Sequence, residues 1–152
     1  MAPAVAAFRL HLGEANIDVE KMHVMESRVY ERAELVDETS LRVLVERFYA
    51  RVRQDPELGP IFNDAIDDWP EHLDKLTAFW SSVMFASGRY KGNPLAAHIK
   101  HRARITPELF DRWLGLWQQT TDEVMGEEAA RDLQFKASRI AESLQLGMFF
   151  RL

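Results

Sequence analysis

Glycine and proline residues interrupt the sequence at a few points and divide it into segments of helical length. The interruptions are Gly59-Pro60, Trp69-Pro70, Gly88, residues 92–94 and Thr106-Pro107. Both residue types disfavour the interior of a helix, so helices are expected to begin or end near them. The segments show no alternation of apolar and polar residues that predicts a strand. The sequence therefore predicts an all-α fold whose helices cross around a shared core.

The first strongly periodic segment precedes Gly59-Pro60. Its apolar residues recur at three- and four-residue spacing, which is typical of an amphipathic helix. They are Leu41, Leu44, Val45, Phe48 and Val52. We expect Thr39 or Ser40 to cap this helix and Asp55-Pro56 to end it. Tyr49 then lies beside its apolar face.

Similar patterns predict four later helices. Helical spacing runs over residues 69–84, with Pro70 acceptable in the first turn. A short segment follows over about residues 95–100. Thr106-Pro107-Glu108 then supplies the cap, the first-turn proline and the early acid of another helix. A last helix is expected over about residues 127–147.

Length and composition limit the possible functions. The chain has 152 residues, of which 47% are hydrophobic, enough for one ordinary domain with a substantial core. The formal net charge of -5 argues against nucleic acid or an anionic membrane as the main partner, because both select for basic surfaces. Cysteine is absent, which excludes disulfides and thiolate metal sites and leaves histidine and carboxylate as metal ligands.

Residues 1–37 carry mixed charge with weak periodicity, and we interpret them as an N-terminal extension to a domain over residues 38–152. The extension is either one amphipathic helix over about residues 17–33 or partly disordered. Three interpretations of its role are open: an added helix that packs on the domain, a segment for self-association, or a mis-assigned start ahead of Met22 or Met25. The sequence has neither a secretion signal nor the roughly 20 consecutive apolar residues that span a bilayer. We therefore expect a cytoplasmic protein with no membrane partner.

The five histidines have different surroundings. His11 and His23 lie among charged residues of the extension, where a solvated side chain is the simplest interpretation. His72 lies on the apolar side of its segment, EHLDKLTAFW, where a structural histidine is more common than a ligand. His98 lies in a short segment after GNP. Taken singly, each is weak evidence for a site.

His101 follows three residues after His98, and such a pair can chelate a small metal ion from one helical face. No nearby carboxylate completes the site. The basic residues around it, Lys100, Arg102 and Arg104, would repel a divalent cation. A zinc site is therefore disfavoured.

His72 and His98 lie on separate segments that each carry aromatic and aliphatic residues, and haem requires such a combination. A porphyrin buries a large apolar face against Phe, Leu and Met side chains, while its iron binds one neutral imidazole. On the opposite side, a tyrosine, histidine or tryptophan can donate a hydrogen bond to a bound diatomic ligand, because iron-bound dioxygen carries partial negative charge.

Four segments of the sequence resemble a known family. They are RFYARVRQDPELGPIF, DWPEHLDKLTAFW, YKGNPLAAH and ITPELFDRWLGLW. In this order and with these spacings they resemble the truncated haemoglobins, most closely their third group. The resemblance runs from Glu38 to Phe150, about three quarters of the chain, and implies a short globin fold around a haem pocket. The N-terminal extension is longer than the minimal family pattern.

The resemblance implies a role for each matching residue. His98 would be the axial ligand of the haem iron. The residues on the distal side, facing the bound ligand, would be Tyr49, His72 and Trp113. Further residues of the haem pocket would be Phe62, Leu76, Phe79, Trp80, Tyr90 and Leu95.

Structural alternatives remain for individual residues. Tyr49 is also consistent with a boundary tyrosine whose hydroxyl meets water, and Trp113 with core packing one turn before Trp117. Phe79 and Trp80 are adjacent on a helix and point about 100 degrees apart, so both need not touch haem.

The resemblance implies haem b (iron protoporphyrin IX) with one axial position open to dioxygen, nitric oxide, carbon monoxide or cyanide. Several distal donors would stabilise bound dioxygen and slow its release. This favours redox chemistry of dioxygen and nitric oxide, or sensing, over bulk oxygen transport. If His72 swings inward, it could bind the iron itself and give a six-coordinate resting state.

Three classes of function stay open. The first is reversible gas binding, with or without sensing. The second is an enzyme, either a nitric oxide dioxygenase or peroxidase-like, which needs an external reductant. The sequence contains no flavin or nicotinamide fingerprint, so that reductant would be a separate reductase. The third is a haem-free helical interaction module.

Overall fold

The computed structural model describes residues 32–33 and 35–150 of the chain. The helix expected over about residues 17–33 lies outside this part, except for its last two residues, which are not helical. Of these two, Ala33 pairs in parallel with Met125, and the backbone hydrogen bonds on either side of the pair are both 2.9 Å long. The pairing ties the start of the described part to the turn between its last two helices.

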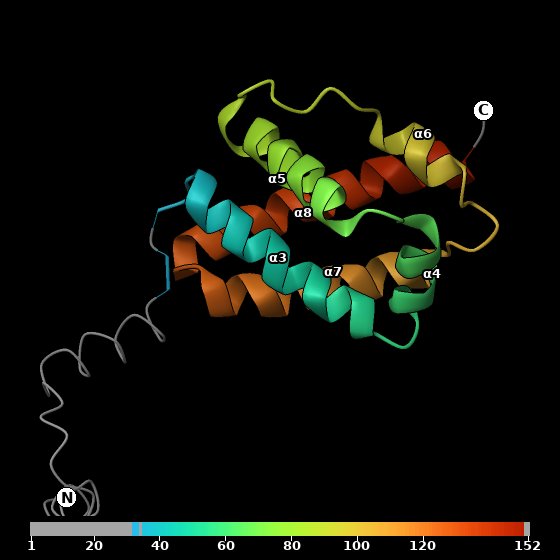
Figure 1. Cartoon of the computed structure of the whole chain (residues 1–152), viewed down its shortest axis with the longest axis horizontal. Coiled ribbons are helices and arrows are strands. Elements are labelled where there is room, and N and C mark those ends of the chain that lie inside the picture. The colour runs from blue at the N-terminus through green and yellow to red at the C-terminus, as the bar shows by residue number, and fades with distance from the viewer. Residues whose placement is uncertain (1–31, 34, 151–152) are drawn as a thin grey trace, which may run out of the picture. The chain divides into compact units, whose positions relative to one another are not determined.

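Six helices make up the described part of the chain, and no strand occurs in it (Figure 1). They are α3 (Glu38–Gln54), α4 (Leu58–Ala65), α5 (Trp69–Phe85), α6 (Pro94–Ile99), α7 (Pro107–Val124) and α8 (Glu127–Phe149). The expected all-α fold is confirmed. Within the described residues, no helix is both long and apolar enough to cross a membrane.

Helix α3 is central to the packing, because it contacts α4, α5 and α7. Helix α8 packs against α7 and against the short helix α6. In the view of Figure 1, α5 and α6 lie above α3 and α7, and α8 passes behind them. The helices thus cross around a common interior, as the sequence predicted.

The start of α3 differs from the prediction. Asp37 is the cap, not Thr39 or Ser40: its carboxylate accepts a hydrogen bond from the Ser40 N–H at 2.7 Å. The Ser40 hydroxyl in turn accepts from the Asp37 N–H at 2.9 Å. This reciprocal pair satisfies two amide donors that a helix start leaves free, so the helix begins at Glu38.

Helix α4 begins at Leu58, beside the Gly59-Pro60 pair, so a helix does start near this interruption, but no helix was expected between residues 56 and 68. Pro60 lies in the first turn, where its missing N–H removes no helical hydrogen bond. Gly59 is required by a close approach, because a Cβ at this position would lie 2.6 Å from the Arg53 carbonyl oxygen. The pair therefore permits a tight corner between α3 and α4.

Asp55 fixes the same corner. Its carboxylate accepts hydrogen bonds from the N–H groups of Glu57 at 3.0 Å and Leu58 at 2.9 Å. The Arg112 guanidinium on α7 also donates to it, with Nε 2.8 and 2.9 Å from the two carboxylate oxygens. The bond from Arg112, with the backbone donors, lowers the pKa of Asp55 from 3.8 to about 2. One carboxylate thus joins the α3–α4 corner to α7.

The next three helices each begin with a polar cap before a first-turn proline, of which Pro70 and the Thr106-Pro107 start were expected. Asp68 accepts from the Glu71 N–H at the start of α5, and Asn93 from the Ala96 N–H at the start of α6. Thr106 caps α7, as expected. Each cap satisfies one of the orphan donors at its helix start.

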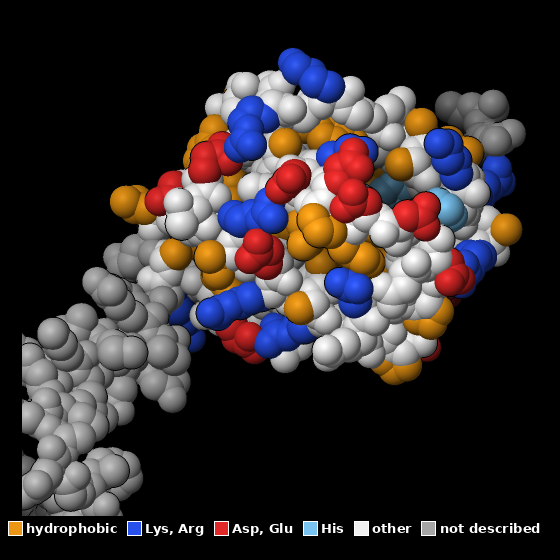
Figure 2. Space-filling view, in the orientation of Figure 1, with side chains coloured by type: hydrophobic (Ala, Val, Ile, Leu, Met, Phe, Trp, Pro, Cys, Tyr) orange, Lys and Arg blue, Asp and Glu red, His pale blue; other side chains and the backbone are white. Residues whose placement is uncertain are grey.

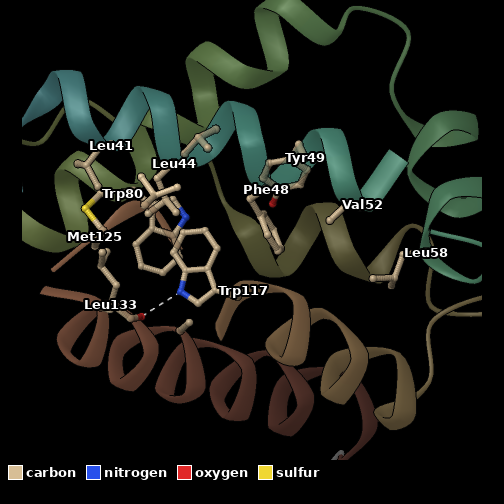
Figure 3. Packing of buried hydrophobic residues seen from close by; sticks show 14 of the residues in the cluster. Leu41, Leu44, Phe48, Tyr49, Val52, Leu58, Trp80, Trp117, Met125 and Leu133 are labelled. Carbon is tan, nitrogen blue, oxygen red and sulfur yellow. Dashed lines mark hydrogen bonds between the residues drawn. The ribbon is translucent and has the colours of Figure 1, made fainter. Parts of the chain in front are cut away.

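The core lies where α3, α5, α7 and α8 meet (Figure 3). The apolar face predicted for α3 is confirmed, since all five of its expected members are fully buried. Trp80 and Trp117 are the largest fully buried side chains. The Trp117 indole N–H donates to the Leu133 carbonyl at 3.2 Å, which satisfies the polar atom of this buried ring.

Candidate functional site

A cavity of about 730 Å³ lies among α3, α4, α5, α6, α7, α8 and the segment of residues 89–93. This volume falls within the roughly 300–1,000 Å³ of small-molecule and cofactor pockets. Its lining is mostly apolar. The lining residues with polar or charged side chains are Tyr49, His72, Lys75, Arg89, Tyr90, Lys91, Asn93, His98, His101 and Trp113.

His98 is held by the first turn of its own helix. Its Nδ1 lies 2.7 Å from the carbonyl oxygen of Pro94. A carbonyl oxygen only accepts hydrogen bonds, so Nδ1 must carry the proton and donate it. In the neutral ring the lone pair is then on Nε2, in a side chain that lines the cavity. Behind it, the Phe110 ring lies nearly parallel, with 6.2 Å between the ring centroids.

Tyr49 and Trp113 form a polar pair within the apolar wall contributed by α3 and α7. Tyr49 is 4% exposed, and burial raises the pKa of its phenol. The nearby Trp113 indole opposes this rise in the pKa. The phenolic O–H itself remains available as a donor, in a residue that lines the cavity.

His72 lies on α5, half-buried at the cavity, with Tyr49 and Trp69 packed against its ring. The centroid of the His72 ring lies 6.3 Å from that of the Tyr49 ring and 5.7 Å from that of the Trp69 ring. In both pairs the ring planes are nearly perpendicular. Burial lowers the pKa of His72, and the positive charge of Lys75 lowers it further. These two effects favour the neutral form of the imidazole.

The other predicted pocket residues divide into two groups. Those that line the cavity are Phe62, Leu76, Phe79, Trp80 and Tyr90. Phe79 and Trp80 both do so despite being neighbours on α5. Leu95 is not among the described lining residues: it faces Gly147 of α8, where an added Cβ would lie 2.8 Å from a Leu95 methyl carbon.

A hydrogen-bonded cluster holds the segment before α6 at the edge of the cavity. The Glu38 carboxylate forms an ion pair with Arg89, which lines the cavity, and accepts from the buried hydroxyl of Ser81. The bond from Ser81, followed by the contacts with Arg89, lowers the pKa of Glu38. The Tyr90 N–H also donates to the Ser82 hydroxyl at 3.0 Å. Two adjacent serines of α5 therefore pin this segment.

Comparison with known families supports this arrangement. A family profile described as bacterial-like globin matches residues 14–144, most of the chain. The chain belongs to this family.

Two further comparisons identify the group of globins that this chain resembles. The globin is 35% identical over 116 residues to a group 3 truncated hemoglobin of Campylobacter jejuni, covering 74% of this chain and 91% of that protein. Its fold is similar to the crystal structure of a group III truncated hemoglobin from Campylobacter jejuni, with a TM-score of 0.72 and 34% identity. That match covers 79% of this chain and 97% of the other. The expected relationship to the truncated haemoglobins, most closely their group III, is confirmed.

The residues at the cavity fit a haem group. An imidazole with a free Nε2 lies on α6, and apolar and aromatic side chains supply walls for a flat macrocycle. Lys75, Arg89 and Lys91 also line the cavity, and their charges are opposite to those of the haem propionates. Membership of the globin family accordingly supports haem binding and the binding of diatomic ligands such as dioxygen.

Sequence reasoning missed several lining residues of this globin. The basic residues Lys75, Arg89 and Lys91 come from separate segments, and no sequence pattern brings them together. Helix α8 contributes Ile140 and Leu144. Its apolar periodicity could have indicated a buried face, although not which interior that face meets. On the face shown in Figure 2, histidine side chains reach the surface between acidic and basic side chains.

Proposed function

We propose that this globin binds haem b through Nε2 of His98 and leaves the opposite axial position for a diatomic ligand. The observation that carries the proposal is the 2.7 Å hydrogen bond between His98 Nδ1 and the Pro94 carbonyl. Between the two neutral tautomers it selects the one with a free Nε2, and it fixes the ring orientation. Such an outer hydrogen bond also raises the basicity of a ligating imidazole. Bound haem would supply a redox-active iron with one open position.

The chain's own residues would set the affinity for the ligand. Tyr49, Trp113 and His72 would face it, and the phenolic O–H of Tyr49 remains protonated at neutral pH because burial raises its pKa. In an apolar cavity, a donor of this kind stabilises the partial negative charge of bound dioxygen more strongly than it would in water. Dioxygen would then be held firmly, and nitric oxide, carbon monoxide and cyanide could occupy the same position.

The remaining predicted residues would hold the macrocycle. Phe62, Leu76, Phe79, Trp80 and Tyr90 would contact its apolar faces or edges, and Lys75, Arg89 and Lys91 would pair with its carboxylates. Leu95 would not contact the haem itself. It would pack α6 against Gly147 and so support the helix that carries His98.

The main function would be redox chemistry of dioxygen and nitric oxide, or sensing, rather than bulk transport. Slow release from a pocket with several donors opposes delivery. Sustained turnover would require electrons from a separate reductase, and the proposed location is the cytoplasm.

Absorption spectroscopy of the full chain after haem addition tests the ligand assignment, with His98→Ala as the variant and His101→Ala as its matched control. We expect the wild type and His101→Ala to give a sharp Soret band that shifts with carbon monoxide. His98→Ala should bind haem at least about 100-fold more weakly, since even an outer-shell change at a metal site costs 10–100-fold. A normal spectrum in His98→Ala would remove His98 as the ligand. A wild type without a Soret band would favour the haem-free interaction module.

Peroxidase-like activity is a second candidate function, and the lowered pKa of His72 favours it. A neutral imidazole beside the ligand position can accept a proton from a peroxide and return it as the O–O bond breaks. His72→Leu should therefore reduce peroxide turnover while leaving carbon monoxide binding in place. Equal turnover in the two proteins would exclude this role. A ferric spectrum that changes from low spin to high spin in the same variant would instead identify His72 as a second axial ligand.

A further inference from the structure

Three of the four tryptophans form a stack beside the cavity. The centroids of Trp80 and Trp117 lie 4.5 Å apart with ring planes at 15°, and those of Trp113 and Trp117 lie 5.7 Å apart with planes at 4°. Trp80 and Trp113 line the cavity, and Trp117 is fully buried between α3 and α8 (Figure 3). The stack therefore joins the cavity to the centre of the core.

We propose that this indole stack is an electron donor to the cavity. When a hydroperoxide is reduced there, the stack gives up one electron and holds the positive charge as a delocalised radical cation. The inference rests on the proposed function, because it requires a redox-active group in the cavity.

The electrons and protons balance as follows for hydrogen peroxide. Its reduction to two water molecules breaks the O–O bond and takes up two protons from solvent and two electrons. One electron would come from the bound haem and the other from the indole stack. An external one-electron reductant such as ascorbate would then supply two electrons in successive steps, one to the stack and one to the haem.

The geometry of the stack favours an indole that loses an electron but keeps its N–H proton. Parallel rings in contact share a positive charge, which is more stable there than on a single ring. The Trp117 N–H donates to the Leu133 carbonyl oxygen, which accepts a hydrogen bond but is too weak a base to take the proton. Phe48 packs perpendicular to both Trp113 and Trp117 and is fully buried, so water is excluded from that side of the stack.

The neighbouring oxidisable side chains are less suited to this role. A tyrosine must release its phenolic proton when it is oxidised. Tyr49 is buried beside Trp113, whose indole N–H only donates and cannot receive that proton. Trp69 carries the Arg53 guanidinium 4.5 Å from its ring centroid. That positive charge stabilises the neutral ring and opposes a second positive charge on it. Trp69→Phe is therefore the matched control: it removes an indole that lies outside the stack and beside a positive charge.

The first test uses the full chain without haem. Photochemically generated azide radicals oxidise indoles by one electron, and transient absorption then distinguishes the protonated indole radical from the neutral one. We expect a long-lived protonated radical in the wild type and in Trp69→Phe. Trp117→Phe should lose most of that signal. A wild type that yields only the neutral radical, or a Trp117→Phe protein that matches it, would overturn the proposal.

The second test adds hydrogen peroxide to the haem-loaded chain and follows the radical by electron paramagnetic resonance, with oxidised residues mapped by mass spectrometry. We expect a tryptophan radical in the wild type and in Trp69→Phe, and its loss in Trp117→Phe. A tyrosyl signal in the wild type would overturn the assignment. If the chain binds no haem, the proposed function fails, and the photochemical test still decides whether the stack holds the charge.

Trp117 belongs to the core, so its variant is first checked for native circular dichroism. If Trp117→Phe does not fold, Trp113→Phe replaces it, because Trp113 lies at the half-buried end of the stack. This variant shortens the stack to Trp80 and Trp117. It should shorten the lifetime of the protonated radical, and an unchanged lifetime would contradict the proposal.

Discussion

The two walls of the cavity are held in different ways. The wall that would be distal in the proposed function carries Tyr49, His72 and Trp113 on the long helices α3, α5 and α7, whose other side chains form the core. The wall that would be proximal includes α6, a helix of six residues of which none is buried. His98 is placed there by two local contacts, the Pro94 carbonyl oxygen and the Asn93 cap that starts the helix.

Because of this difference, we expect substitutions in the two walls to affect folding stability and haem or ligand binding to different extents. Distal side chains are positioned by the same packing that stabilises the fold, so changes in or behind that wall should affect folding and ligand chemistry together. His98, the proposed iron ligand, is placed mainly by contacts within its own short helix and by the packing of Leu95 on α8, so changes there should affect haem binding while folding stays nearly intact. The predictions that follow test this separation.

The largest effect is expected for Phe48→Ala. Phe48 is fully buried behind Tyr49 and Trp113, and large-to-small changes of this kind cost about 3–5 kcal/mol of the free energy of unfolding. His98→Ala removes a half-buried side chain from a helix without buried residues, so its cost should stay below about 1 kcal/mol. Urea denaturation of the two haem-free proteins, followed by circular dichroism, measures both. Similar costs would contradict the separation.

The sequence predicted the features that depend on local chemistry. Thr106-Pro107 starts α7 as expected because a cap and a first-turn proline act over a few residues. The start of α3 was placed two or three residues late because Asp37, Thr39 and Ser40 can each cap a helix, and the sequence does not rank them.

Features that depend on tertiary contacts were harder to predict. Helix α4 was missed because Gly59 is required by the close approach of the Arg53 carbonyl, which exists only in the folded chain. The ion pair between Glu38 and Arg89 joins residues 51 positions apart. Leu95 lies in the expected segment, but packing on α8 directs it to Gly147.

Tyr49→Phe tests the distal wall with a change that keeps its packing. Removing the phenolic O–H should cost about 1.5–3 kcal/mol of stabilisation of bound dioxygen, the usual range for hydrogen bonds to charged groups. Dioxygen release should then accelerate by about tenfold or more. Stopped-flow displacement by carbon monoxide measures the rate, and the urea midpoint should change little. An unchanged release rate would remove Tyr49 from the ligand site.

Asp55→Ala tests whether the distal wall depends on the α3–α4 corner. The variant loses the acceptor for the N–H groups of Glu57 and Leu58, which should cost about 1–2 kcal/mol. The folded pKa of Asp55 lies below its usual value of 3.8, at about 2, so its contribution is present above pH 4 and is lost as the pH falls toward 2. Urea midpoints between pH 6 and pH 2 should therefore converge for wild type and variant. Parallel curves would contradict this assignment.

Asn93→Ala tests the proximal wall by a comparison of two helix caps. Asn93 caps the short helix α6 and Thr106 caps α7, whose buried residues belong to the core. Loss of either cap costs about 1 kcal/mol at its own helix. Because α6 adds little to the core, Asn93→Ala should leave the urea midpoint nearly unchanged and speed the transfer of haem to an excess of apomyoglobin several-fold. Thr106→Ala should lower the urea midpoint and change haem transfer less. If both variants alter both measurements equally, the two walls are one cooperative unit, and the placement of His98 depends on the whole core.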